Sequence, residues 1–503
     1  MTEPIFEKFT AGVSSTGCTE TIKAECKTNL LQEDIKQILS VYAWADVKER
    51  SAVKDSLKFT VKTSFYMCYL NSEEVVKKLE TSCETVGVKA IVGLNEGERV
   101  RVEANVVKTE VDTEGINLGF SAVVEVKAIR SEKIEINALT GGNELFTDCR
   151  EVPIMKDFGT REGVYPIEEE FELAGEVAEV LGHRADAVIT ATQCGVGSII
   201  VDGQVFLTVI ALQKAQKCSI IKETRTVPFR MEIEHDDAMP TMNARAVVKE
   251  KSFKTEILVD EETGRSTVNA SVMMCFTGSA FISDTVSLAI DEFSDLRITE
   301  HTTEKVQISR PKELKTMVES LSCRAGVEEM PIGVSILAVG NERLEIAELQ
   351  TTTNGVKVTA ELSCVGYFSD ADGKLFTKRL VAPVEKTFDN LFEEECSVSE
   401  TRLLVEKTSA RIVSANEVEI DGDLILSIYT DENLSFNYIS DLSVKGDKPV
   451  NPHAISVYIP TEGEELWSLA KRLNTCPDTV ISANPELTFP LTGKERIVVY
   501  RQK

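Results

Sequence analysis

The chain has 503 residues, which is enough for about three to four domains of ordinary size. Hydrophobic residues make up 42% and charged residues 27% of it, and both values are typical of a globular protein with a packed core rather than of a disordered chain. The formal net charge of -27 argues against nucleic acid and anionic membrane surfaces as partners, because both carry the same sign of charge.

The first residues, Met1 to Lys8, form no apolar segment of the kind found in a signal peptide. No apolar run approaches the ~18 residues that a membrane-spanning helix needs. The twelve cysteines are scattered singly, without the Cys-x-x-Cys spacing of zinc or thioredoxin motifs. We therefore expect a cytosolic protein with no membrane span and with reduced, buried cysteines; a cross-linking role for some of them is the alternative.

A unit of about 150 residues, mostly strand, recurs three times along the chain. Each copy contains a long strand with apolar alternation, at 57–69, 199–210 and 356–367. Its second half contains a strand, a turn and another strand, at 100–107 with 116–126, 242–248 with 266–276, and 410–413 with 418–429. Because alternation with a period of two puts apolar side chains on one face, we expect half-buried antiparallel strands.

Helices are expected to be few in these copies, at 72–81, 166–181 and 312–321, where apolar residues follow helical spacing. The predicted fold class is therefore mainly β, with three tandem β-rich, sandwich-like repeats followed by a small α+β domain. The predicted ranges are an N-terminal segment at 1–30, repeats at 31–160, 161–305 and 306–450, and the final domain at 452–503.

The second copy carries three motifs: Val201-Asp202-Gly203 in a strand, Pro228-Phe229 between its halves, and Asp291-Glu292-Phe293-Ser294 after its last strand. In these it resembles the SPOCS family (the domain of unknown function DUF3794) of spore-coat proteins from endospore-forming Firmicutes. The first copy is similar through its opening residues 38–41 and the strands that follow, and the third copy is the most divergent.

The last fifty or so residues predict strand, helix, helix and strand, at 457–459, 464–473, 479–484 and 496–500. In the first helix, Leu466, Leu469, Ala470 and Leu473 follow the i, i+3, i+4, i+7 spacing of a buried stripe. Pro485 ends the second helix, because proline disfavours helical geometry in the residue before it.

This segment resembles a LysM domain through Gly463, Glu464, Leu466, Trp467, Leu469, Ala470, Asn484, Pro485, Gly493 and Ile497. LysM domains commonly bind N-acetylglucosamine polymers such as peptidoglycan, and some bind proteins instead. The resemblance implies a binding surface on two loops with the helix start between them, formed by Thr461, Glu462, Gly463, Glu464, Trp467, Asn484, Pro485, Glu486 and Leu487. Whether Trp467 packs in the core or contacts a ligand stays open at this stage.

Sequence motifs for catalysis are missing. There is no Gly-x-Ser-x-Gly, no His-Glu-x-x-His and no phosphate-binding Gly-x-x-x-x-Gly-Lys pattern. Gly195-Val196-Gly197 precedes a strand rather than a helix, and His235 beside Asp236-Asp237 is read as a solvated acidic loop. We therefore expect no enzyme activity, no cofactor and no metal site.

SPOCS repeats followed by one LysM domain is the arrangement of a clostridial protein of spore-coat morphogenesis. It implies a scaffold in the mother-cell cytoplasm, at the forespore surface and spore coat. The implied partner is a coat ATPase resembling stage IV sporulation protein A, or another coat protein. Acidic runs at 168–170 and 393–395 are solvated faces or docking strips for a basic partner, and edge strands allow self-association. The alternative is a protein that binds the peptidoglycan glycan of the spore or cell wall.

Overall fold

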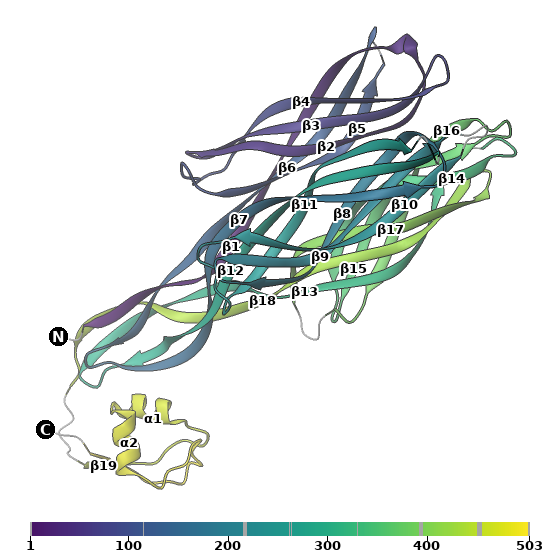
Figure 1. Cartoon of the computed structure of the whole chain (residues 1–503). Coiled ribbons are helices and arrows are strands. Elements are labelled where there is room, and N and C mark those ends of the chain that lie inside the picture. Colours follow the sequence, from purple (N-terminus) through teal and green to yellow (C-terminus); the bar gives the residue numbers. More distant parts are fainter. Residues whose placement is uncertain are drawn as a thin grey trace.

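The computed structural model describes residues 3–113, 115–214, 219–260, 262, 264–328, 330–391, 396–449 and 455–500, with the backbone alone at 13–15 and 131. The protein is mainly β, as predicted, with 77% of its residues in strands and a short helical segment near the C-terminus. It consists of three β units in chain order and a C-terminal module, residues 455–500 (Figure 1).

Each β unit contains six strands. The first unit has β1 (Pro4–Leu31), a 3-10 helix η1 (Gln32–Asp34), β2 (Ile35–Val53), β3 (Ser56–Asn71), β4 (Val76–Ala90), β5 (Val100–Asp112) and β6 (Asn117–Gly142). The second has β7 (Phe146–Leu173), β8 (Val177–Cys194), β9 (Ser198–Gln213), β10 (Ile220–Glu234), β11 (Asn243–Asp260) and β12 (Arg265–Phe293). The third has β13 (Arg297–Gly326), β14 (Ser335–Thr351), β15 (Val356–Ser369), β16 (Leu375–Phe388), β17 (Ser397–Ser414) and β18 (Glu417–Asp447).

The same topology recurs in all three units. The first, sixth and fifth strands form one antiparallel sheet, in the orders β1-β6-β5, β7-β12-β11 and β13-β18-β17. The second, third and fourth strands form the other, in the orders β2-β3-β4, β8-β9-β10 and β14-β15-β16. Apolar side chains from the two sheets pack on each other within a unit, as Phe65 of β3 does on Phe120 of β6 with ring centroids 5.3 Å apart.

The sheets group the residues differently from the ranges predicted for the repeats. Residues 1–30, set apart as an N-terminal segment, contain β1, which pairs with β6 along almost its whole length. The predicted boundaries at 160/161 and 305/306 fall inside β7 and β13, and the sheets of one unit end before each of these strands begins. The first strand of each unit is easily misassigned because its partner follows it by about a hundred residues or more.

The three helices predicted within the β units are wrong. Residues 72–81 form a turn and the start of β4, 166–181 belong to β7 and β8, and 312–321 lie within β13. Val76 and Leu79 have helical spacing, but they lie in the strand β4. The burial of this strand follows a period of two, since every second residue from Leu79 to Thr85 is partly buried. Pairing with the central strand β3, which places Leu79 opposite Met67, overrides the local pattern.

The three units pack against one another through equivalent strands. Leu39 and Tyr66 of the first unit, Ile210 of the second, and Tyr367 and Leu375 of the third share one apolar cluster. A second cluster joins the extended ends of the first and sixth strands of every unit: Ala11, Ile136, Ala138, Val152, Ile154, Leu288, Ile308, Phe436 and Tyr438. Figure 1 shows these ends converging in a narrow stem beside the N-terminus, with the C-terminal module beyond it.

The C-terminal module has the predicted order of strand, helix, helix and strand. It consists of β19 (Ile455–Tyr458), α1 (Leu466–Leu473), α2 (Pro477–Ala483) and β20 (Ile497–Tyr500), with β19 antiparallel to β20. The predicted stripe on α1 is confirmed, since Leu469, Ala470 and Leu473 are fully buried. No helix in the parts of the chain that the structure describes has the length and apolar character to cross a bilayer.

Candidate functional site: the C-terminal module and the junction of the β units

The loop after β19 is held tightly to the loop before β20. Gly463 has a positive φ of 81°, and its N–H donates to the Leu491 carbonyl over 2.7 Å. The carboxylate of Glu464 accepts hydrogen bonds from the Thr461 N–H at 3.0 Å and from the Arg472 guanidinium at 2.9 Å. These bonds lower the pKa of Glu464 and leave only 8% of its side chain exposed. Gly463 and Glu464 therefore shape the loop.

The second predicted loop divides into internal and exposed residues. The Asn484 amide donates to the Val480 and Val498 carbonyls at 2.9 and 2.7 Å and accepts from the Val498 N–H at 2.8 Å, which joins α2 to β20. Leu487 packs against the module core. Pro485 and Glu486 are exposed, as are Thr461 and Glu462 in the first loop. Together with Gly463, which is also exposed, these are the predicted contact residues that a ligand can reach freely.

Trp467 contacts the second β unit. Its indole N–H donates to Asp291 Oδ2 over 2.8 Å, and its ring meets the Phe293 ring edge to face at 5.1 Å between centroids. Both partners lie at the end of β12, within the SPOCS-like motif 291–294. Trp467 therefore packs against protein rather than standing free for a ligand, and the surface it packs on belongs to the second β unit rather than to the C-terminal module alone.

The outer face of the module's two-stranded sheet is apolar and exposed. Ile455, Val457 and Ile459 are 61%, 61% and 70% exposed, and Tyr500, opposite Ile455, is 53% exposed. Ile455 and Val457 lie on one face of β19 because alternate residues of a strand share a face, and Ile459, directly after the strand, continues the stripe. The sequence reasoning missed this surface, although the spacing of 455, 457 and 459 was visible.

A cavity of about 770 Å³ lies where the three β units meet. Most of its lining comes from β2 and β5 of the first unit, β8 and β11 of the second, and β14 and β17 of the third, and it contains many charged side chains of both signs. Burial raises the pKa of Glu250 to about 8 and lowers that of His183 to about 3. At neutral pH His183 is therefore uncharged. Its Nε2 atom shares a hydrogen bond with the Tyr42 hydroxyl at 3.1 Å, in which the tautomer of the ring decides which atom donates.

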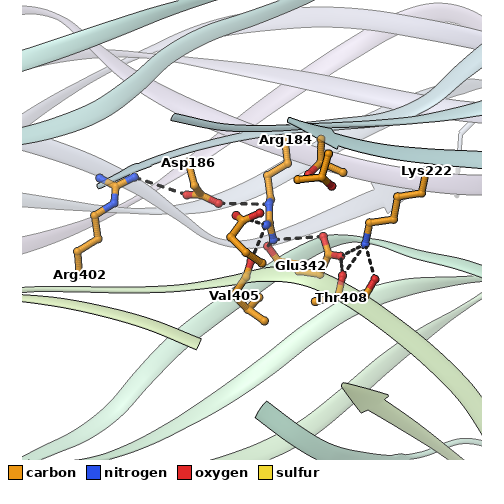
Figure 2. A network of polar contacts seen from close by, with 10 residues as sticks. Arg184, Asp186, Lys222, Glu342, Arg402, Val405 and Thr408 are labelled. Atoms are coloured by element: carbon orange, nitrogen blue, oxygen red, sulfur yellow. Dashed lines mark hydrogen bonds and ion pairs between the residues drawn. The ribbon is translucent and has the colours of Figure 1, made fainter. Parts of the chain in front are cut away.

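A buried ion network, of which Arg184, Asp186 and Glu342 also line this cavity, joins the second unit to the third (Figure 2). Arg184 of β8 contacts Asp186 in its own strand at 3.2 Å, Glu342 of β14 at 3.2 Å and Glu406 of β17 at 2.6 Å. Lys222 of β10 contacts the other oxygen of Glu342 at 2.7 Å. The two glutamates are almost completely buried, with side chains 1% and 2% exposed.

The two glutamates of this network titrate differently. Burial by itself raises the pKa of Glu342, but Arg184 and Lys222 outweigh it and hold the pKa at about 2. Glu406 has Arg184 as its ion-pair partner, and burial raises its pKa to about 7. Arg184 and Lys222 thus face a Glu342 carboxylate whose lowered pKa keeps it ionised at neutral pH, so these charges pair across the contact between the second and third units.

The residues considered for catalysis are dispersed. His235 is fully buried and contacts the Gly159 carbonyl at 3.0 Å, so its assignment to a solvated loop is wrong, although Asp236 and Asp237 are exposed. Gly195-Val196-Gly197 lies in the turn between β8 and β9. The acidic run 168–170 lies on β7, where Glu169 pairs with Arg225 at 2.9 Å, and the run 393–395 lies outside the described residues.

Within the described ranges, no group of three or more His, Cys, Asp and Glu side chains is placed to hold a metal ion. The eleven cysteines in those ranges are free thiols. In comparisons with known proteins, no family model matches this sequence, and no curated protein matches it.

Proposed function

We propose that this protein is a non-enzymatic scaffold of the spore coat, in which the three β units form the body and the C-terminal module docks it to a coat basement-layer protein. The observation that carries this proposal is the apolar stripe of Ile455, Val457 and Ile459 on a module that is attached to a large β body. Exposed contiguous apolar patches on a soluble protein are a common sign of a protein interface.

The β body supports a structural role. Each unit repeats one topology, and apolar clusters and the buried ion network hold the three units together. Apolar side chains fill the cores between the sheets of each unit, and paired charges line the cavity where the units meet. The partner proposed for the module is a coat ATPase resembling stage IV sporulation protein A, which follows from the resemblance to SPOCS repeats and a LysM domain.

The test uses the full chain and a purified ATPase of the stage IV sporulation protein A type as the binding partner. Val457→Lys places a charge in the apolar stripe and is expected to weaken binding at least tenfold. The matched control is Val88→Lys, because Val88 is a valine of similar exposure, 56%, on strand β4 of the first unit. Equal binding by both variants would contradict the proposal.

Peptidoglycan binding is the second candidate, because Thr461, Glu462, Pro485 and Glu486 stay exposed on the loops where LysM domains bind glycans. Retention of the full chain on purified peptidoglycan, lost in Thr461→Ala with Glu462→Ala and kept in Val457→Lys, would establish the glycan function instead. No retention on peptidoglycan, together with tight binding to the ATPase, supports the scaffold.

A further inference from the structure

We propose that the end of β12 and the two residues after it, Asp291 to Asp295, are a docking site for the chain's own C-terminal module, and that Trp467 anchors this docking instead of contacting an outside ligand. The inference concerns the position of the module. It does not depend on the proposed function, and its test needs no partner protein.

A single carboxylate organises the polar part of the contact. Asp291 accepts one hydrogen bond from the Trp467 indole N–H, at 2.8 Å, and one from Lys471 Nζ, at 2.5 Å, one on each oxygen. Trp467 and Lys471 are four residues apart on α1 and therefore lie on the same face of this helix. One face of α1 is thus fixed to β12 by charge-assisted bonds, which are stronger than neutral ones.

An aromatic contact continues the module core into the second unit. Phe293 is 3% exposed and belongs to the same apolar cluster as Leu469, Ala470 and Leu473 of α1. Its ring lies 5.1 Å from that of Trp467 and 5.1 Å from that of Phe146, the first residue of β7. The module is small, and domains below about 40 to 60 residues bury too little surface to be very stable alone. Docking therefore adds apolar burial where the module needs it.

The end of α1 makes a second set of contacts with the same segment. Asn474, the C-cap residue of α1, donates to the Asp295 carbonyl at 2.6 Å. Lys448 donates to the Ser294 carbonyl at 2.7 Å and to the Asn474 side chain at 2.5 Å. Contacts at both ends of the helix restrict its rotation as well as its distance from β12.

Among the strand pairs that the structure describes, this surface belongs to the second unit alone. The ladder between its first and last strands ends in the pair Phe146 and Phe293. The corresponding terminal pairs are Pro4 with Gly142 in the first unit and Arg297 with Asp447 in the third. Neither provides an aromatic ring for Trp467. The motif 291–294, which carried the family resemblance of the second copy, thus acquires a physical role in this chain.

Tryptophan fluorescence tests the docking directly, because the chain has two tryptophans, Trp44 and Trp467. In a Trp44→Phe background, all emission comes from Trp467. We expect Asp291→Ala combined with Phe293→Ala to shift this emission to longer wavelength and to roughly double its quenching by acrylamide. Hydrogen exchange of the β19 and β20 amides reports whether the module stays folded.

Two further variants make the test decisive. Asp295→Ala is the matched control, because Asp295 contacts the module through its backbone carbonyl, which the substitution keeps. Lys471→Met removes the ion pair with Asp291, and it spares the core because the Lys471 side chain is 40% exposed. We expect it to raise the quenching of Trp467 less than the double variant does.

Quenching at the control level in both the double variant and Lys471→Met would overturn the proposal. So would quenching of the parent that changes with protein concentration, because the module would then dock on a neighbouring copy rather than on its own chain. Concentration-independent protection of Trp467 that is lost in the double variant supports it.

Discussion

The ion network between the second and third units provides the sharpest stability prediction, through Glu342→Ala. The Glu342 side chain is 1% exposed and contacts Arg184 at 3.2 Å and Lys222 at 2.7 Å, and it also accepts a bond from the Thr408 hydroxyl. Removing this carboxylate leaves two cations with less compensation at a buried site. Truncating one member of a buried ion pair typically costs about 3 to 5 kcal/mol.

The loss falls unequally on the two cations. Arg184 keeps two carboxylates, Glu406 at 2.6 Å and Asp186 at 3.2 Å, whereas Lys222 keeps two neutral acceptors of Thr408, its carbonyl at 3.1 Å and its hydroxyl. Most of the penalty should therefore come from Lys222. The double variant Glu342→Ala with Lys222→Met should then recover about 1 to 3 kcal/mol relative to the sum of the single changes, as expected for residues in direct contact.

The assay is chemical denaturation of the full chain monitored by far-ultraviolet circular dichroism. Thermal unfolding measured by calorimetry provides an independent comparison of the same variants. Glu110→Ala is the control, because Glu110 also pairs with a lysine, Lys108 at 2.5 Å, but on the exposed surface, where a pair contributes about 0 to 1 kcal/mol. A loss below about 1 kcal/mol in Glu342→Ala, or additive effects in the double variant, would refute the view that this network joins the units.

Three further predictions concern the cavity, the second β unit and the C-terminal module. Burial raises the pKa of Glu250 to about 8 in the folded chain, above its ordinary value of 4.5, so its contribution to stability is fully present below about pH 4.5 and is lost progressively as pH rises from there through 8. Glu250→Gln should therefore gain about 1 to 3 kcal/mol over the parent at pH 9 and almost nothing at pH 4, and an equal difference at both pH values would contradict the assignment. Gly203→Ala should destabilise the fold by about 2 to 3 kcal/mol in denaturation experiments, because a Cβ there overlaps the Val188 carbonyl and the Phe229 ring. Gly141→Ala, with open space around the new methyl group, should be almost neutral. Asn484→Ala removes three hydrogen bonds within the module and should speed hydrogen exchange in β20 by a factor that corresponds to about 2 to 3 kcal/mol, whereas unchanged exchange would indicate a role in ligand contact instead.

Alternation of apolar residues located most of the fold from the sequence. The runs at 57–69, 199–210 and 356–367 lie within β3, β9 and β15, the central strands of three equivalent sheets. The order of elements in the C-terminal module was also predicted correctly. The errors arose in short windows such as 312–321, where helical spacing competes with a strand, and at unit boundaries, where the partner of the first strand lies far along the chain.

The candidate site was less predictable, because the resemblance located loops but not their contacts. Glu464 and Asn484, on which the predicted resemblance partly rested, hold the module together in this chain. Trp467 lies 176 residues from Asp291, and nothing in the spacing of either residue indicates the other. The exposed stripe of β19 was visible as alternation, but exposure depends on which face of the sheet the helices cover.

Net charge and most of the local structure follow from the order of residues along the chain: a strongly acidic composition, strands with a period of two, and one small module with two helices. The strand pairs that close each sheet, the charges that meet between the units, and the position of the module at the stem depend instead on tertiary packing. This division arises because side-chain periodicity is a property of neighbouring residues in the backbone. Ion pairs such as Arg184 with Glu406, 222 residues apart, and the docking of Trp467 on Phe293 form only where separate surfaces fit in three dimensions.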